Sequence, residues 1–317
     1  MNKKIYVAGH SGMVGSAVIR ELKKRNYSKI LVRSLENLDL IKQAQVENFF
    51  NQEQPEVVII AAAKVGGILA NNTYRAEFIY DNLMIEANLI NAAHKYDCKK
   101  LIFLGSSCIY PKLAPQPLKE EYLLSDYLED TNEPYAIAKI TGIKLCENFY
   151  RQYGANFYSV MPTNLFGPND NFNLETSHVL PAFIRKFHEA KINNDNAVTI
   201  WGSGKPMREF LFVEDVADAL LFLMENVNAK DIYDNGISMI NVGTGKDISI
   251  NELASLIAKI VGFKGEILHD ETKPDGTPRK LLDVSRMKSL GWEYKTELQD
   301  GIKKTYKWFR DNIEIRT

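Results

Sequence analysis

A tyrosine and a lysine lie four positions apart in the segment TNEPYAIAK, which spans residues 131–139. On a helix this spacing places Tyr135 and Lys139 on one face. An ammonium group beside a phenol favours the phenolate, so we expect Tyr135 to exchange a proton with an alkoxide near neutral pH. That is general acid chemistry. Because the same spacing arises by chance in many helices, the other elements of the chain have to support this interpretation.

The helix that carries this pair is marked at both ends. Pro134 suits a first helical turn, where a missing N–H costs nothing, and Gly154 suits the position after the last turn. The sequence therefore predicts a helix from about Pro134 through Leu145 to about Tyr153.

Short apolar segments alternate with helical segments in the first half of the chain. A long helix is predicted at about residues 76–96, and the predicted strands are residues 4–8, 30–32, 57–60, 100–104 and 157–161. This alternation is typical of an α/β fold with a doubly wound parallel sheet. Ligands of such sheets bind at the carboxyl ends of the strands.

A glycine-rich turn, GHSGMVG at residues 9–15, follows the first strand and opens a helix that runs to about Arg25. Its first glycine permits a tight turn, its second lets backbone approach a pyrophosphate, and its third allows close packing of helix on strand. The helix N-terminus then faces the phosphates. We expect this turn to bind a dinucleotide through Gly9, Ser11, Gly12, Met13, Val14 and Gly15.

Arg33 follows the second strand, at the position where an NAD enzyme usually places an acidic residue on the ribose 2′-hydroxyl. An arginine attracts a 2′-phosphate, so NADP is favoured over NAD. The alternative is that Arg33 is only a solvated loop residue. Asp39 and Leu40 are expected to border the adenine.

Three further strand ends supply candidate residues. After the third strand, small residues let the backbone of Ala62, Ala63 and Lys64 lie near the cofactor. After the fourth, Ser106 or Ser107 can hydrogen-bond a substrate carbonyl oxygen. After the fifth, the segment that reaches towards the nicotinamide consists of Pro162, Thr163, Asn164 and Leu165.

The order of the predicted elements also indicates how the chain divides into domains. We expect residues 1–168 to form a dinucleotide-binding domain, to which residues of about 210–245 return. Residues 169–317 are expected to form mainly a smaller substrate-binding lobe, because loops rich in Gly, Pro or charge flank shorter elements there, at residues 169–177, 202–209 and 271–280.

Composition excludes several classes of protein. The 39 basic and 40 acidic residues nearly cancel, and no basic run stands out, so neither nucleic acid nor an anionic membrane is expected as the main partner. Cys98, Cys108 and Cys146 lack CxxC or CxxH spacing, which predicts no disulfide framework and no metal site. This cysteine pattern is compatible with a protein of the reducing cytoplasm. We expect neither a signal peptide nor a membrane span, since no apolar run approaches 18 residues.

Several phrases along the whole chain resemble the extended short-chain dehydrogenase/reductase family. They are AAAKVGGI (61–68), GSSCIYPK (105–112), TNEPYAIAKI (131–140), SVMPTNLFGP (159–168), WGSGKPMREF (201–210) and KPDGTPRKLLDV (273–284). The resemblance implies a Rossmann sheet and an activity on a GDP-sugar. It implies epimerisation of GDP-4-keto-6-deoxy-D-mannose at C3 and C5, then hydride transfer from NADPH to C4, which yields GDP-L-fucose.

The resemblance also implies roles for the candidate catalytic residues. Tyr135 would protonate the C4 oxygen, with Ser106 as hydrogen-bond partner and Lys139 tuning Tyr135 and holding the nicotinamide ribose. Inversion at C3 and C5 needs one group to remove a proton and another to return it. Cys108 and His178 match the positions that the family uses for this pair, and His178 also borders the cofactor. The alternatives are a packed core thiol and a surface histidine.

The same resemblance implies which residues bind the sugar nucleotide. Its candidate residues are Ser107, Cys108, Lys186, Trp201 and Arg208, with Asp275 as a weaker candidate. Arg208 offers a charged fork suited to a diphosphate, whereas Trp201 could be core alone.

The chain departs from the family's pattern at two positions. The family commonly carries arginine at position 186, where Lys186 keeps the charge and loses bidentate geometry. It often carries arginine at position 11, and Ser11 weakens the grip on a 2′-phosphate. Some use of NADH is therefore expected.

Two rival functions remain. The first is a related C4 reductase or epimerase/reductase on another GDP-4-keto sugar, such as a GDP-6-deoxy-heptose; retention of Cys108 and His178 argues for a double epimerase, because a C4 reductase alone does not use them. The second is a redox-sensing binding protein, which has no reason to keep Ser106, Tyr135 and Lys139 together. The resemblance further implies a homodimer in which helices near residues 76–96 and 135–153 form a four-helix bundle.

Overall fold

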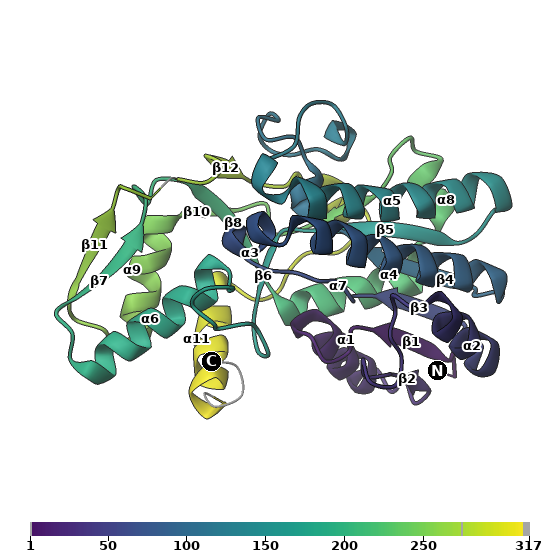
Figure 1. The fold of residues 1–317 in the computed structure, drawn as a ribbon, viewed down its shortest axis with the longest axis horizontal. Helices are drawn as coiled ribbons and strands as arrows, with labels where there is room; N and C mark the ends of the chain where they lie inside the picture. The colour runs from purple at the N-terminus through teal and green to yellow at the C-terminus, as the bar shows by residue number, and fades with distance from the viewer. Residues whose placement is uncertain (1, 274, 313–317) are drawn as a thin grey trace.

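The computed structural model describes residues 2–273 and 275–312. Its centre is a parallel sheet of six strands in the order β2-β1-β3-β4-β5-β9 (Figure 1). The strands are β1 (Ile5–Ala8), β2 (Ile30–Leu31), β3 (Val57–Ile60), β4 (Lys100–Leu104), β5 (Phe157–Pro162) and β9 (Ile240–Val242). The predicted doubly wound α/β sheet is confirmed, and each of the five predicted strands is present.

Helices cover both faces of this sheet because successive strand residues point to opposite sides. On one face α1 (Met13–Lys24) and α7 (Val213–Asn226) pack over Ile5 and Val7. The opposite face, which carries Tyr6 and Ala8, is covered by α2 (Gln43–Glu53), α4 (Arg75–Lys95) and α5 (Glu133–Tyr153). The predicted helix around Tyr135 does end at Tyr153, and Gly154 follows it in the left-handed conformation with φ +69°.

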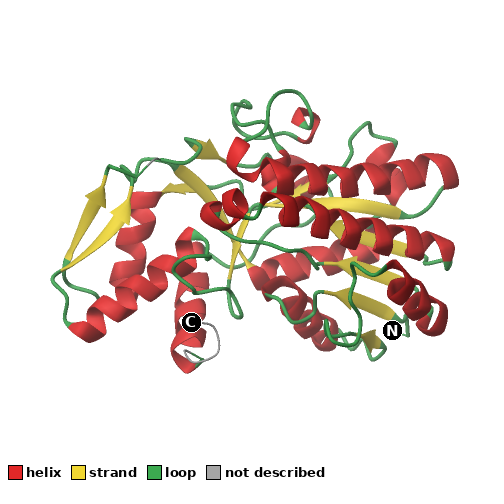
Figure 2. Cartoon of the chain, viewed as in Figure 1, coloured by secondary structure: helices red, strands yellow, loops and turns green. Residues whose placement is uncertain are grey.

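A separate hydrophobic core lies beside the sheet. It is built by α6 (Val179–Asn193), α9 (Ile250–Val261) and α11 (Leu298–Asp311). Two small sheets complete this region (Figure 2): β7 (Ala197–Trp201) with β11 (Glu266–Asp270), and β8 (Met207–Phe212) with β6 (Asn164–Phe166), β10 (Asp247–Ser249) and β12 (Arg279–Lys280). The domain boundary near residue 168 stays a prediction.

The remaining helices are short. They are α3 (Ile68–Thr73), α8 (Ala229–Tyr233), α10 (Ser285–Ser289) and three 3-10 turns at Ser107–Ile109, Glu120–Tyr122 and Asp130–Asn132. In the part of the chain that the structure describes, no helix combines the length and the apolarity needed to cross a membrane.

Candidate active site

The candidate cofactor residues and the residues of the turn after β4 lie in segments that follow strands of the six-stranded sheet, at its carboxyl edge. With the order β2-β1-β3, the connections after β1 and after β3 leave in opposite directions, which opens a crevice above these strand ends. The glycine turn follows β1, residues 61–67 follow β3, and the 3-10 turn Ser107–Ile109 follows β4. The parallel sheet thus brings together segments that are far apart in the sequence.

The glycine turn has the close contacts that a dinucleotide cradle requires. Gly9 has φ +82°, and a Cβ there would lie 2.6 Å from the amide nitrogen of Ala62. A Cβ on Gly15 would lie 2.1 Å from the carbonyl oxygen of Gly9. Asn169 closes over the turn, since its side-chain amide donates to the carbonyl oxygen of Ser11 at 3.2 Å. This backbone cradle ahead of α1 fits a pyrophosphate.

We expect Gly15→Ala to destabilise the chain by about 1–3 kcal/mol, because the added Cβ overlaps backbone that cannot move cheaply. Gly12→Ala is the matched control, since a Cβ at position 12 would meet its nearest atom at an ordinary 3.4 Å. The measurement is the free energy of unfolding in urea. Equal values for the two variants would mean that the turn tolerates a side chain at its third glycine.

Arg33 follows β2, as the sequence indicates, but its guanidinium already contacts other groups of the protein. It pairs with Glu53, donates to the carbonyl oxygen of Val32 at 2.8 Å and lies 5.2 Å from the centre of the Phe49 ring. The sequence prediction did not foresee Glu53. A 2′-phosphate would therefore compete with a carboxylate for this arginine.

The other predicted adenine-side and ribose-side residues are held by neighbouring groups. The Asp39 carboxylate accepts from the amide of Ile41 at 3.0 Å. The Lys64 ammonium pairs with Asp81 at 2.9 Å and with Glu77, and its amide donates to Asn82. Asn82 thus fixes the backbone of the segment after β3.

Tyr135 and Lys139 do lie on one face of α5, and a third group joins them. The Lys139 nitrogen lies 5.7 Å from the centre of the Tyr135 ring and 3.0 Å from a carboxylate oxygen of Glu86 on α4. Sequence reasoning missed Glu86, although a glutamate on the buried face of a helix was a usable signal. This carboxylate is the ion-pair partner of Lys139.

The structure differs from the expected acidity of Tyr135. Burial, together with the nearby Cys108 and Glu86, raises the pKa of Tyr135 well above its ordinary value. Tyr135 is therefore a phenol at neutral pH, which is the form that donates a proton.

Cys108 lies in the 3-10 turn after β4 and is only 7% exposed. Burial raises the pKa of its thiol, while a hydrogen bond with Ser106 and the Lys280 ammonium act in the opposite direction. Ser107, Cys108 and Lys280 line the same small cavity. A positive charge thus lies near Cys108, yet the net shift of its pKa favours the neutral thiol.

His178 is the N-cap residue of α6, and it is exposed to solvent. The protein atoms around its ring lower its pKa, and the Lys280 ammonium lowers it further. The imidazole is therefore neutral at pH 7 and able to accept a proton. Lys280 acts on both His178 and Cys108, and it was not among the residues predicted from sequence.

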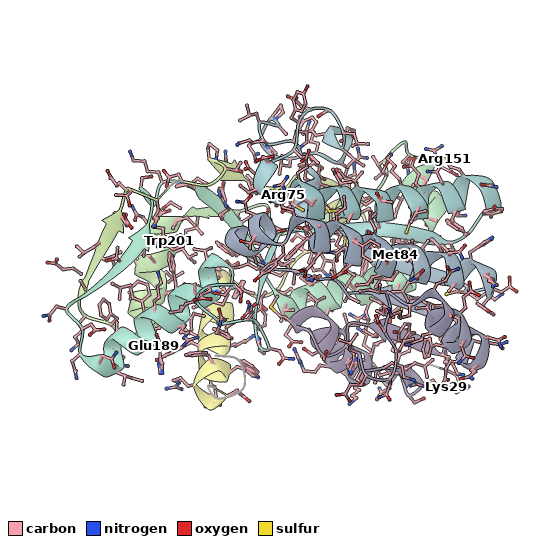
Figure 3. The ribbon with its side chains drawn as sticks, viewed as in Figure 1. Lys29, Arg75, Met84, Arg151, Glu189 and Trp201 are labelled. Carbon is pink, nitrogen blue, oxygen red and sulfur yellow. The ribbon has the colours of Figure 1, made fainter. Side chains whose placement is uncertain are left out.

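The candidate nucleotide-sugar residues form a basic and aromatic group. Trp201, which is labelled in Figure 3, is not a core residue, because 62% of it is exposed, and two ammonium groups lie by its ring. Lys186 is 5.9 Å and Lys273 is 5.6 Å from the ring centre. Burial lowers the pKa of Lys186. Lys273 was missed by sequence reasoning.

Arg208 and Asp275 have different roles in this group. Arg208 is half-buried, and burial lowers its pKa while Asp275 raises it. Asp275 accepts from the amide of Ser203 at 2.9 Å and from its hydroxyl at 2.6 Å. The carboxylate thus holds the turn after β7, whereas the guanidinium of Arg208 is the group suited to an anion.

The segment after β5 is tied to β8. The side chains of Thr163 and Asn164 both donate to the carbonyl oxygen of Glu209, at 3.3 and 2.8 Å. That residues 162–165 contact a nicotinamide therefore stays a prediction, and it concerns mainly the backbone of this segment. The buried Glu209 carboxylate accepts from Leu282 and Gly245, both at 2.8 Å, and so anchors the segment that follows Lys280.

Comparisons with known proteins agree with this arrangement. Residues 5–243 match the model of the NAD dependent epimerase/dehydratase family. The GDP-L-fucose synthase of Escherichia coli is 55% identical over 312 residues, which are 98% of this chain and 97% of that protein. A solved GDP-6-OMe-4-keto-L-xylo-heptose reductase from C. jejuni has a TM-score of 0.92 at 41% identity and covers 98% of both chains. A GDP-L-fucose synthetase from Naegleria fowleri bound to NADP has a TM-score of 0.88 at 30% identity, over 98% of this chain and 95% of that one.

Proposed function

The chain belongs to the NAD dependent epimerase/dehydratase family, and from that premise we propose that it converts GDP-4-keto-6-deoxy-D-mannose to GDP-L-fucose. The activity comprises epimerisation at C3 and C5 and then reduction at C4. The observation that carries the proposal is that Cys108 lies near Tyr135 and shares Lys280 as a neighbour with His178, in a chain 55% identical to a GDP-L-fucose synthase.

Epimerisation depends on the C4 ketone, which acidifies the protons on C3 and C5. A neutral imidazole at His178 can accept a proton, and the Cys108 thiol can return one. One inversion therefore leaves His178 as an imidazolium and Cys108 as a thiolate, and a second inversion with the roles exchanged restores both side chains. Lys280 lies close to both and offers a positive charge beside the enolate oxygen or the thiolate that forms.

Reduction uses the residues of α5 and the turn after β4. NADPH, when bound in the glycine cradle, supplies the hydride for C4. Tyr135 donates its phenolic proton to the C4 oxygen, and Ser106 hydrogen-bonds the same oxygen. Lys139 holds the nicotinamide ribose and stabilises the phenolate that remains.

The nucleotide end of the substrate is assigned to the basic and aromatic group beside β7 and β8. The Trp201 ring stacks with a base, and Lys186 and Lys273 lie where phosphate charge needs neutralising. Arg208 binds the diphosphate through its charged fork.

The test of the function is a product analysis. Purified protein is incubated with NADPH and GDP-4-keto-6-deoxy-D-mannose, and the product sugar is identified by NMR. We expect GDP-L-fucose with one NADPH consumed per sugar. Turnover only with a GDP-4-keto-6-deoxy-heptose would support the alternative, which the C. jejuni neighbour makes the chief rival.

Arg33→Asp is expected to weaken NADPH binding by about 10–100-fold more than NADH binding, because it replaces attraction for the 2′-phosphate by repulsion. The wild type is expected to prefer NADPH and to use NADH to some extent. The measurement is the dissociation constant of each reduced cofactor from fluorescence titration.

Arg151→Asp is the control for this charge reversal, since Arg151 pairs with Glu147 near the far end of α5. Equal losses for NADPH and NADH in Arg33→Asp would remove Arg33 from the 2′-phosphate site. A second variant, Glu53→Gln, frees the guanidinium and should strengthen NADPH binding selectively.

We also propose that the enzyme is a cytoplasmic homodimer. The exposed apolar residues Tyr80 on α4 and Ile137 and Tyr153 on α5 support a partner surface on these helices, which lie side by side (Figure 1). All three cysteines are free, which suits a reducing compartment. Light scattering after size exclusion should give about twice the mass of 36.0 kDa.

A further inference from the structure

We infer that Glu86 is a positioning residue of the reduction: it fixes the Lys139 ammonium beside Tyr135 and balances its charge. The inference concerns a buried ion pair between α4 and α5. Glu86 is 1% and Lys139 is 2% exposed, and their charged atoms are 3.0 Å apart. It rests on the proposed reduction, in which Tyr135 is the proton donor.

The surroundings of the pair are shaped to hold it. The Lys139 nitrogen lies 4.6 Å from the centre of the Phe103 ring on β4, so the ammonium is confined between an aromatic face and the carboxylate. Gly142 makes room for Glu86, because a Cβ at position 142 would lie 2.8 Å from the second carboxylate oxygen. An alanine at position 142 would overlap first with the Phe103 ring and also with Glu86, so both side chains would have to shift.

A buried ion pair is a poor means of stabilising a fold. The desolvation of both charges offsets most of their attraction, and apolar residues of similar volume often stabilise more. This α4 position adjoins the apolar core that contains Leu89 and Ile143. A glutamate there is better explained by its effect on Lys139.

The charged and titratable groups around Glu86 show which side chains change their pKa in its presence. Burial raises the pKa of Glu86, while Lys139, which faces it from α5, lowers it. Glu86 in turn raises the pKa of Tyr135 and of Cys146, both also on α5. Without Glu86, Tyr135 would face an unbalanced ammonium and would ionise at lower pH.

The principal test is the pH profile of turnover in Glu86→Gln, which keeps shape and removes charge. Donation by Tyr135 fails once the phenol ionises, so activity falls on the alkaline side. We expect the alkaline limb of Glu86→Gln to lie about one pH unit or more below that of the wild type. Turnover at neutral pH should fall about tenfold, with little change in the KM for the ketone.

Glu147→Gln is the matched control. Glu147, on α5, is likewise a poorly exposed carboxylate in ion pairs, here with Lys144 and Arg151, and it lies about 12 Å along the helix from Lys139. Its alkaline limb should coincide with that of the wild type. Glu86→Asp, which retains the charge, should restore the limb of Glu86→Gln towards the wild-type position.

A second measurement needs no catalysis. Urea unfolding of the cofactor-free chain is compared for Glu86→Gln, Lys139→Met and the double variant. Breaking a buried pair by one substitution should lower the folding equilibrium constant on the order of 10²–10³-fold, and the double variant should recover much of that loss.

The two measurements separate the possible failures. An unmoved alkaline limb in an active Glu86→Gln variant overturns the inference and leaves the proposed reduction intact. Additive unfolding effects of Glu86→Gln and Lys139→Met also overturn it, because they would mean that the two groups do not interact. A wild-type chain that does not oxidise NADPH with the ketone instead contradicts the proposed function.

Discussion

Tyr135→Phe is expected to lower the turnover number for NADPH-dependent reduction by about 10²–10⁴-fold, the usual contribution of a positioned general acid. The substitution removes only the phenolic hydroxyl group and keeps the ring. The T-shaped contact of the ring with Phe78, at 6.4 Å between centroids, can persist. Binding of NADPH should therefore remain nearly unchanged. The measurement is the rate of NADPH oxidation at saturating ketone, combined with a binding titration.

Tyr158→Phe provides the control for this substitution. Tyr158 is fully buried in β5, and its hydroxyl has no hydrogen-bond partner within the described residues. Loss of that hydroxyl should change neither turnover nor binding. If Tyr135→Phe kept most of the wild-type rate, another group would have to supply the proton to the C4 oxygen.

Cys108→Ser is expected to slow proton exchange at C3 or C5 by about 10²–10⁴-fold, since a serine hydroxyl is far harder to deprotonate than a thiol. Cofactor binding and intrinsic carbonyl reduction should be much less affected. The variant should accumulate unepimerised ketone or reduce it slowly to a GDP-sugar of the D-manno series. NMR of the sugar in deuterated water follows both outcomes.

Cys146→Ser is the matched variant, because Cys146 is a buried thiol on α5 that takes no part in the proposed chemistry. It should exchange both positions at the wild-type rate. Wild-type exchange at both carbons in Cys108→Ser would instead make Cys108 a structural thiol.

The central sheet could be predicted from the sequence because its strands are short apolar runs with clear ends. Val57–Ile60 and Lys100–Leu104 were placed to the residue. The first helical turn and the end of α5 were also predictable, since Pro134 and Gly154 have backbone preferences that act locally. Such features depend on neighbours in the sequence.

The missed residues depend on contacts across the fold. In the sequence, Glu86 looks like any glutamate of a helix, because its partner Lys139 comes from another helix, α5. The available signal was its position on the buried face of α4, where Phe78, Asn82 and Glu86 recur every four residues. Lys280 lies on β12, whose pairing with β8 is distant in the sequence from Cys108. The fold nevertheless places both residues in the lining of one cavity.

The acidity of Tyr135 was misjudged for the same reason. The sequence shows the tyrosine and the lysine of α5 four positions apart, but not the carboxylate from α4 that balances the ammonium. It also does not show the depth at which the phenol is buried, which is the largest cause of its raised pKa. Residues far apart in the sequence thus set the chemistry of Tyr135.

Deuterium labelling of the product tests the double-epimerase reaction most directly. Wild-type protein is given GDP-4-keto-6-deoxy-D-mannose and NADPH in deuterated water, and the product is analysed by NMR. The proposed reaction places deuterium at both C3 and C5 of GDP-L-fucose and leaves protium from NADPH at C4. A reduced sugar of the D-manno series, without deuterium at C3 and C5, would contradict it.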